Sequence, residues 1–106
     1  MKKFKDTKYV NLLNEYREAG GRVIVYSDYP AGEKIDALGL ECDAIYDPKH
    51  SSFKALKPNP ETLKCIIDEQ DLSVEDVVYI GDRVEKDGEC AQICGIKFVY
   101  HKAVVN

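Results

Sequence analysis

The 106-residue sequence lacks any apolar run that approaches the ~18 residues needed to span a membrane. Its lysine-rich start also lacks the apolar core of a signal peptide. The sequence has 15 Lys and Arg against 19 Asp and Glu, which gives a formal charge of −4. It contains no run of basic residues that could bind a phosphate backbone. We therefore expect a cytoplasmic protein that binds neither a membrane nor nucleic acid.

Close Cys-x-x-Cys spacing, typical of zinc and redox sites, is absent as well. The four cysteines, Cys42, Cys65, Cys90 and Cys94, are therefore expected to be free thiols. Cys90 and Cys94 lie on one predicted helix at a spacing that would allow a shared metal. The same spacing is typical of one buried helix face, which we favour.

What the sequence does contain is an alternation of amphipathic and apolar segments without repeats or linkers. Periodicity and turn residues predict helices over about 6–19, 30–39, 60–70 and 87–94, and strands over 23–26, 44–46, 77–80 and 97–100. The first strand is apolar without alternation, as in parallel sheets that are covered on both faces. These features predict one α/β domain over residues 1–106, a three-layer Rossmann-like open parallel sheet.

Two aspartates follow the apolar strand that ends at Gly81. Gly81 permits a sharp turn, so Asp82 would lie at the carboxyl edge of the sheet, where open α/β folds bind ligands. Asp87, at the start of the next helix, would point toward the same crevice. The two carboxylates would suit Mg²⁺, although a turn residue and a helix cap are the alternative for this segment taken alone.

Two further polar side chains occupy similar positions. Ser27 follows the first strand, where its hydroxyl could bind a phosphate oxygen or simply cap a turn. Lys57 precedes a helix entry, where it could provide a fixed charge or point into solvent. A hydroxyl, an ammonium group and two carboxylates thus lie where predicted strands end or helices begin. Together these groups are suited to binding a phosphoryl group.

With these motifs in place, the sequence resembles the haloacid dehalogenase (HAD) superfamily of hydrolases. Residues 23–27 resemble its second motif, an apolar strand that ends in Ser or Thr. Residues 56–60 resemble its lysine motif, and Gly81, Asp82 and Asp87 resemble its GDxxxxD motif. The resemblance extends over about residues 8–100 and implies a HAD-like core fold.

The resemblance also implies a role for each of these residues. Asp82 would be a Mg²⁺ ligand, and Asp87 would support either the water shell of the metal or Lys57. Lys57 would be the catalytic lysine that neutralises the nucleophile and the phosphoryl group. Ser27 would bind the phosphoryl group, while Asp28 replaces the Asn that many relatives have.

One family feature is missing from these residues. Members begin with a strand ending in Asp-x-Asp, whose first Asp attacks phosphorus, but no Asp-x-Asp occurs in this sequence. Asp6 follows charged residues and has no second aspartate. We therefore expect the C-terminal part of a HAD core, truncated and incomplete at its central strand, that is inactive alone.

Three classes of function follow from this interpretation. The favoured class is a fragment of a phosphatase that acts on a small phosphorylated metabolite, with the nucleophile strand on other sequence. The alternative is a non-catalytic module, derived from a HAD fold, that binds phosphate, metal or protein. A purely structural domain is the third.

The same resemblance predicts association with another chain or segment. In the family, the nucleophile strand lies between the strands that correspond to residues 22–27 and 77–81. Without it, each strand has an unpaired inner edge, which recruits other strands. Direct pairing of the two strands would require helices to move by about one strand spacing, ~4.8 Å. We therefore expect self-association, or complementation by a missing N-terminal segment.

Overall fold

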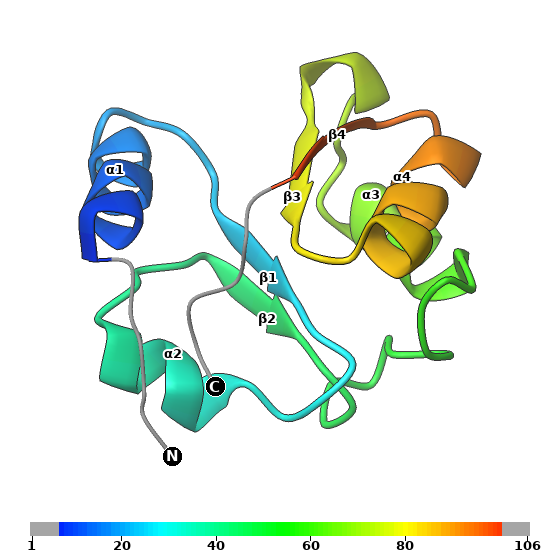
Figure 1. Cartoon of the computed structure of the whole chain (residues 1–106), viewed down its shortest axis with the longest axis horizontal. Helices are drawn as coiled ribbons and strands as arrows, with labels where there is room; N and C mark the ends of the chain where they lie inside the picture. Colours follow the sequence, from blue (N-terminus) through cyan, green and yellow to red (C-terminus); the bar gives the residue numbers. More distant parts are fainter. Residues whose placement is uncertain (1–6, 101–106) are drawn as a thin grey trace. The chain divides into compact units, whose positions relative to one another are not determined.

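The computed structural model describes residues 7–100, so Asp6 lies outside the described part (Figure 1). The elements, in order, are α1 (Thr7–Glu18), β1 (Ile24–Tyr26), α2 (Gly32–Leu38), β2 (Ala44–Tyr46), α3 (Glu61–Glu69), η1 (Val74–Asp76), β3 (Val78–Gly81), η2 (Val84–Gly88), α4 (Glu89–Ile93) and β4 (Lys97–Tyr100). The chain divides into two compact units, with the boundary between Ser51 and Ser52. No helix among the described residues has the length and apolarity that crossing a bilayer requires.

The N-terminal unit contains the parallel pair β1–β2, in which Ile24 lies opposite Ala44. Glycine ends both of its helices, as the sequence predicts. Gly20 and Gly39 have φ angles of 106° and 75°, a left-handed conformation in which glycine avoids the strain of a side chain. The buried apolar side chains of this unit are Val10, Val23, Ala31, Ile35 and Tyr46.

Asp43 connects the first helix of this unit to its first strand. One carboxylate oxygen of Asp43 accepts the Val23 N–H at 2.7 Å, and the other accepts the Arg17 Nε–H at 3.1 Å. The hydrogen bond from the Val23 backbone is the main reason why the pKa of Asp43 lies below its usual range. These contacts fix where β1 begins.

The C-terminal unit contains the parallel pair β3–β4, in which Ile80 lies opposite Val99. One face of this pair carries Tyr79 and Phe98, whose ring centres are 5.9 Å apart. The Phe98 ring also lies beside Gly88, where an added Cβ would be 3.4 Å away. The buried apolar side chains of this unit are Leu63, Ile66, Cys90, Ala91 and Ile96.

The loop before α3 is held by side-chain hydrogen bonds. The Thr62 hydroxyl oxygen is fully buried and accepts the N–H groups of Lys54 at 2.8 Å and Ala55 at 3.3 Å. The Asn59 side chain accepts the N–H of Glu61, the first residue of α3, at 2.9 Å. The loop is thereby fixed on both sides of Lys57.

The α/β class with parallel strands is confirmed, and the start of one helix differs from the sequence prediction. The four described strands form two two-stranded sheets, β1–β2 and β3–β4, so β1 and β3 belong to separate sheets. This is the arrangement of an incomplete α/β core. The helix expected to start at Asp87 begins earlier, as the π-helical turn η2, because the Arg83 carbonyl accepts the N–H groups of Asp87 and Gly88.

Candidate functional site

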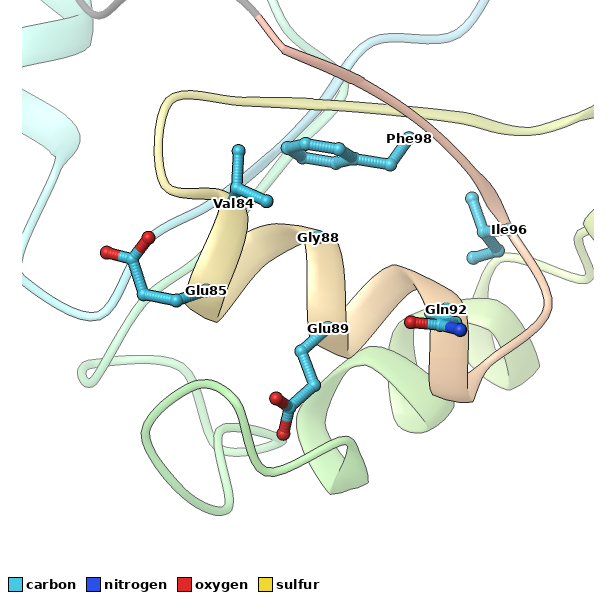
Figure 2. Close-up of a pocket in the computed structure, with 7 residues that line it drawn as sticks. All are labelled: Val84, Glu85, Gly88, Glu89, Gln92, Ile96 and Phe98. Atoms are coloured by element: carbon cyan, nitrogen blue, oxygen red, sulfur yellow. The ribbon is translucent and has the colours of Figure 1, made fainter.

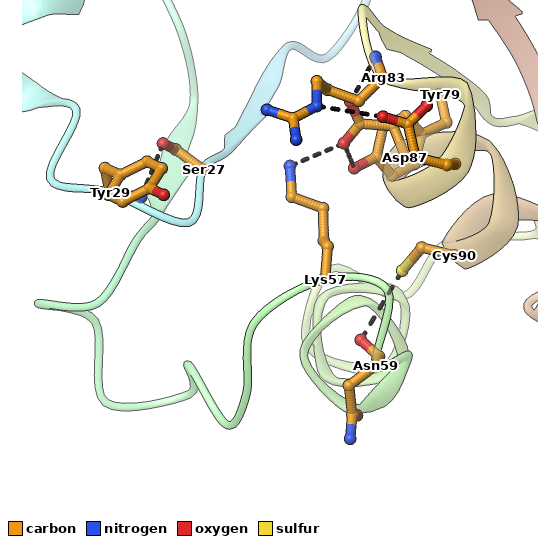
Figure 3. Close-up of polar contacts among 9 residues, drawn as sticks. Ser27, Tyr29, Lys57, Asn59, Tyr79, Arg83, Asp87 and Cys90 are labelled. Atoms are coloured by element: carbon orange, nitrogen blue, oxygen red, sulfur yellow. Dashed lines mark hydrogen bonds and ion pairs between the residues drawn. The ribbon is translucent and has the colours of Figure 1, made fainter.

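Lys57 and Asp87 form an ion pair inside the C-terminal unit (Figure 3). The Lys57 Nζ lies 2.7 Å from Asp87 Oδ1, although the two residues are far apart in sequence. Their side chains are only 12% and 5% exposed, respectively. A charged pair with so little contact with water differs from a surface salt bridge, because loss of either partner leaves an uncompensated buried charge.

Two further donors hold the Asp87 carboxylate in place. The Tyr79 hydroxyl donates to Oδ1 at 2.7 Å, and the Arg83 N–H donates to Oδ2 at 3.2 Å. The carboxylate also occupies the space that Gly81 leaves by having no side chain, since a Cβ there would lie 2.7 Å from Asp87 Cγ. Gly81 is therefore required for the close approach of Asp87.

The loop between Lys57 and α3 contacts α4 through Cys90. The Cys90 thiol is fully buried and donates to the Asn59 carbonyl oxygen at 3.8 Å between sulfur and oxygen. Figure 3 shows Lys57 and Asn59 on one side of this contact, with Asp87 and Cys90 on the other. Burial of Cys90 and half-burial of Cys94 agree with the predicted buried helix face, and all four cysteines are free.

Asp82 directly follows β3 and is exposed. The Oδ1 atom of Asp87 already accepts two hydrogen bonds, which use both of its lone pairs, and Oδ2 accepts a third. Within residues 7–100 there is no cluster of three or more His, Cys, Asp or Glu side chains that could hold a metal. The donors of the described residues alone therefore do not fit a complete Mg²⁺ site.

Ser27 lies at the end of β1, in the N-terminal unit. Its Oγ accepts the Tyr29 N–H at 3.1 Å, which is the geometry of a serine turn, and its own N–H donates to the Tyr46 carbonyl at 2.9 Å. Of the four predicted site residues, the structure thus brings Lys57 and Asp87 into contact. The phosphate-binding role of Ser27 stays a prediction.

Tyr79 is a site residue that the sequence did not reveal. It stands in an apolar strand, where a tyrosine is usually part of the core. The signal that it offered is its position two residues before Gly81, which places it on the same strand face as that glycine. The hydroxyl group of a buried tyrosine usually finds a partner, and here that partner is Asp87.

A pocket of the C-terminal unit lies along η2 and α4 and has a volume of about 470 Å³ (Figure 2). Val84 and Phe98 line one side of it, and Glu85 and Glu89 are its charged lining residues. Two carboxylates disfavour a bound phosphate, and neither Lys57 nor Asp87 lines this pocket. The lining of this pocket is therefore unsuited to phosphate, and phosphate binding by Lys57 stays a prediction.

Comparison with known proteins supports a family assignment. A family model described as haloacid dehalogenase-like hydrolase matches residues 33–101, which include Lys57, Asp82 and Asp87. No curated protein and no solved structure matches the chain significantly.

Proposed function

Because the chain belongs to the haloacid dehalogenase-like hydrolases, we propose that it provides the lysine and carboxylate part of a phosphatase site for a small phosphorylated metabolite. The observation that carries this proposal is the buried ion pair of Lys57 and Asp87. A lysine on a solvated surface would not need a buried carboxylate and a tyrosine hydroxyl to orient it. A lysine that must present its charge at one fixed point does.

The role of Lys57 is electrostatic. Its ammonium group is held at 2.7 Å from Asp87, which is itself fixed by Tyr79 and by the Arg83 N–H. A preorganised positive charge stabilises the negative charge that is spread over the phosphoryl oxygens during transfer, without the cost of reorienting solvent. Asp87 is accordingly a positioning residue for Lys57.

Ser27 would donate a hydrogen bond to the phosphoryl group in the assembled site. The attacking carboxylate would come from an Asp-x-Asp segment that these 106 residues do not contain. Asp82 is the exposed carboxylate that remains for Mg²⁺, and the metal would need further oxygen ligands from that same segment. The chain therefore supplies binding groups and charge, and other sequence supplies the nucleophile.

The proposal predicts weak binding of inorganic phosphate beside Lys57. In a titration followed by amide chemical shifts, the N–H signals of Gly81 and Asp82 should move with millimolar phosphate. The double variant Lys57→Met/Asp87→Leu removes both charges without leaving one buried alone, and it should abolish the shifts. Lys54→Met, an exposed lysine of the same loop, is the matched control and should leave them unchanged.

An assay of phosphate ester hydrolysis distinguishes an enzyme fragment, as proposed here, from a complete enzyme. The chain alone should hydrolyse para-nitrophenyl phosphate no faster than the buffer does, because no aspartyl nucleophile is present. Turnover that disappears in both the double variant and Asp82→Asn would mean that the chain has its own nucleophile. Phosphate shifts that persist in the double variant would instead contradict the assignment of the site.

Binding of Mg²⁺ to the chain alone should also be weak. One free carboxylate with waters makes a loose site for a cation that dehydrates reluctantly. A calorimetric titration should show no affinity tighter than millimolar, with or without Asp82→Asn. Micromolar affinity that is lost in Asp82→Asn would show that the site is more complete than the described donors indicate.

The non-catalytic alternative rests on one observation, the absence of Asp-x-Asp from the sequence. A phosphate-binding module would give the same chemical shifts. The two functions predict different results when an Asp-x-Asp strand from a family phosphatase is fused ahead of Thr7 or added as a separate chain. A fragment of an enzyme should then acquire turnover that depends on Lys57, and a module should not.

A further inference from the structure

Three donors of the C-terminal unit share the Asp87 carboxylate (Figure 3). A carboxylate has two oxygens with about four acceptor positions between them. Lys57 Nζ and the Tyr79 hydroxyl each lie 2.7 Å from Oδ1, and the Arg83 N–H donates to Oδ2. Lys57 therefore has one position on Oδ1, because Tyr79 fills the other.

The two groups on Oδ1 differ in how firmly each side chain is held. The ammonium group of Lys57 ends a flexible four-carbon stem. The Tyr79 hydroxyl is attached to a planar ring with two rotatable bonds, and the ring centre lies 5.9 Å from that of Phe98. The backbones of Tyr79 and Phe98 are themselves paired in the β3–β4 sheet. The tyrosine can thus fix a position that the lysine stem alone cannot.

We propose that Tyr79 is a further positioning residue, which acts through Asp87 and directs the charge of Lys57 at a phosphoryl group. This role rests on the function proposed above. By filling one acceptor position of Oδ1, the hydroxyl confines Lys57 Nζ to the other, so the positive charge lies at one point before the ligand arrives. Binding then costs less, because the lysine side chain is already ordered.

The Tyr79 hydroxyl also preserves the charge that Lys57 presents. A lysine beside a carboxylate attracts an anion less than a lysine alone does, because the carboxylate repels the anion. The hydroxyl directs the positive end of its dipole at Asp87 Oδ1 and offsets part of this repulsion. Phenylalanine at this position would keep the ring and lose both effects.

The first test compares the phosphate affinity of Tyr79→Phe with that of the wild-type protein. In the titration followed by amide chemical shifts, Tyr79→Phe should raise the dissociation constant of inorganic phosphate about three- to tenfold, the equivalent of one hydrogen bond. Tyr16→Phe is the matched control, because it removes the same hydroxyl from a tyrosine of α1 that is 57% exposed. It should leave the constant unchanged.

The mobility of the lysine distinguishes a positioning role from a purely structural one. The order parameter of Lys57 Cε, measured by carbon-13 relaxation on the folded protein, should be high in the wild type without phosphate and should fall in Tyr79→Phe. A loss of stability alone would lower the urea midpoint of unfolding and leave this order parameter unchanged. If Tyr79→Phe does not fold, the wild type still decides, because a mobile Lys57 Cε in the phosphate-free protein would overturn the role.

The outcomes also distinguish this role from the proposed function. Absence of phosphate binding by the wild type would overturn both. Equal phosphate dissociation constants for the wild type and Tyr79→Phe would overturn the role of Tyr79 alone. So would an order parameter of Lys57 Cε that the substitution leaves unchanged.

Discussion

Replacement of Lys57 by methionine is expected to lower the free energy of unfolding by about 3–5 kcal/mol. The Lys57 and Asp87 side chains are 12% and 5% exposed, so removal of the ammonium leaves a carboxylate that water reaches poorly. The hydrogen bonds from Tyr79 and Arg83 remain, but they do not neutralise the charge. Urea unfolding monitored by circular dichroism measures the loss.

Two further variants show whether burial is the cause. Lys54→Met changes an exposed lysine of the same loop and should alter stability by no more than about 0.5 kcal/mol. The double variant Lys57→Met/Asp87→Leu should recover most of the loss, because an apolar pair needs no compensating charge. If Lys57→Met costs less than about 1 kcal/mol, the pair behaves as a surface salt bridge and cannot preorganise a charge.

Gly81→Ala is expected to destabilise the protein by about 2–3 kcal/mol, near the upper end for overpacking in a filled core. The added methyl group would lie 2.7 Å from Cβ, Cγ and Oδ2 of Asp87, and real Cβ atoms do not approach other atoms so closely. The aspartate must therefore move, and its movement breaks the hydrogen bonds from Tyr79 and Arg83. Urea unfolding again gives the free energy.

Gly32→Ala is the matched control for this substitution. Gly32 is the first residue of α2, and an added Cβ there meets nothing within 4 Å. Alanine restricts the unfolded chain more than glycine does, so this variant should be neutral or more stable by up to about 1 kcal/mol. Equal losses from the two glycine variants would show that the contact with Asp87 is not responsible.

Much of the local structure follows from the sequence because its signals are local. Gly20 and Gly39 end helices through a left-handed conformation that the sequence already indicates. The strands Ala44–Tyr46 and Lys97–Tyr100 have the predicted bounds, since apolar residues between turn residues define them. The α/β class then follows from the alternation of the elements.

The start of the helix after β3 could not be predicted in this way. Its first turn is a π-turn, in which the Arg83 carbonyl accepts N–H groups from residues four and five positions ahead. No residue type favours such a turn. What stabilises it is the Asp87 carboxylate, which accepts the Arg83 N–H and is itself held by Lys57.

The contacts of the candidate site likewise could be predicted only in part from the sequence. Glycine and acidic spacing indicated that Asp82 and Asp87 belong to a site, and the resemblance allowed Asp87 to support Lys57. The structure has this ion pair, but the distance between two side chains that are 30 residues apart depends on tertiary packing. Tyr79 was missed for the same reason, because its partner Asp87 lies beyond the turn at Gly81.

Burial of Cys90 has a consequence for measuring motion at the site. Its thiol is fully enclosed and donates to the Asn59 carbonyl, two residues after Lys57, while Cys42, Cys65 and Cys94 are half-buried. A thiol reagent therefore reaches Cys90 only when α4 separates from the segment that carries Lys57. Under conditions where reclosing is faster than the chemical reaction, the rate of Cys90 alkylation reports the free energy of that opening. Alkylation of Cys90 therefore measures the equilibrium by which the segment that carries Lys57 loses its contact with α4.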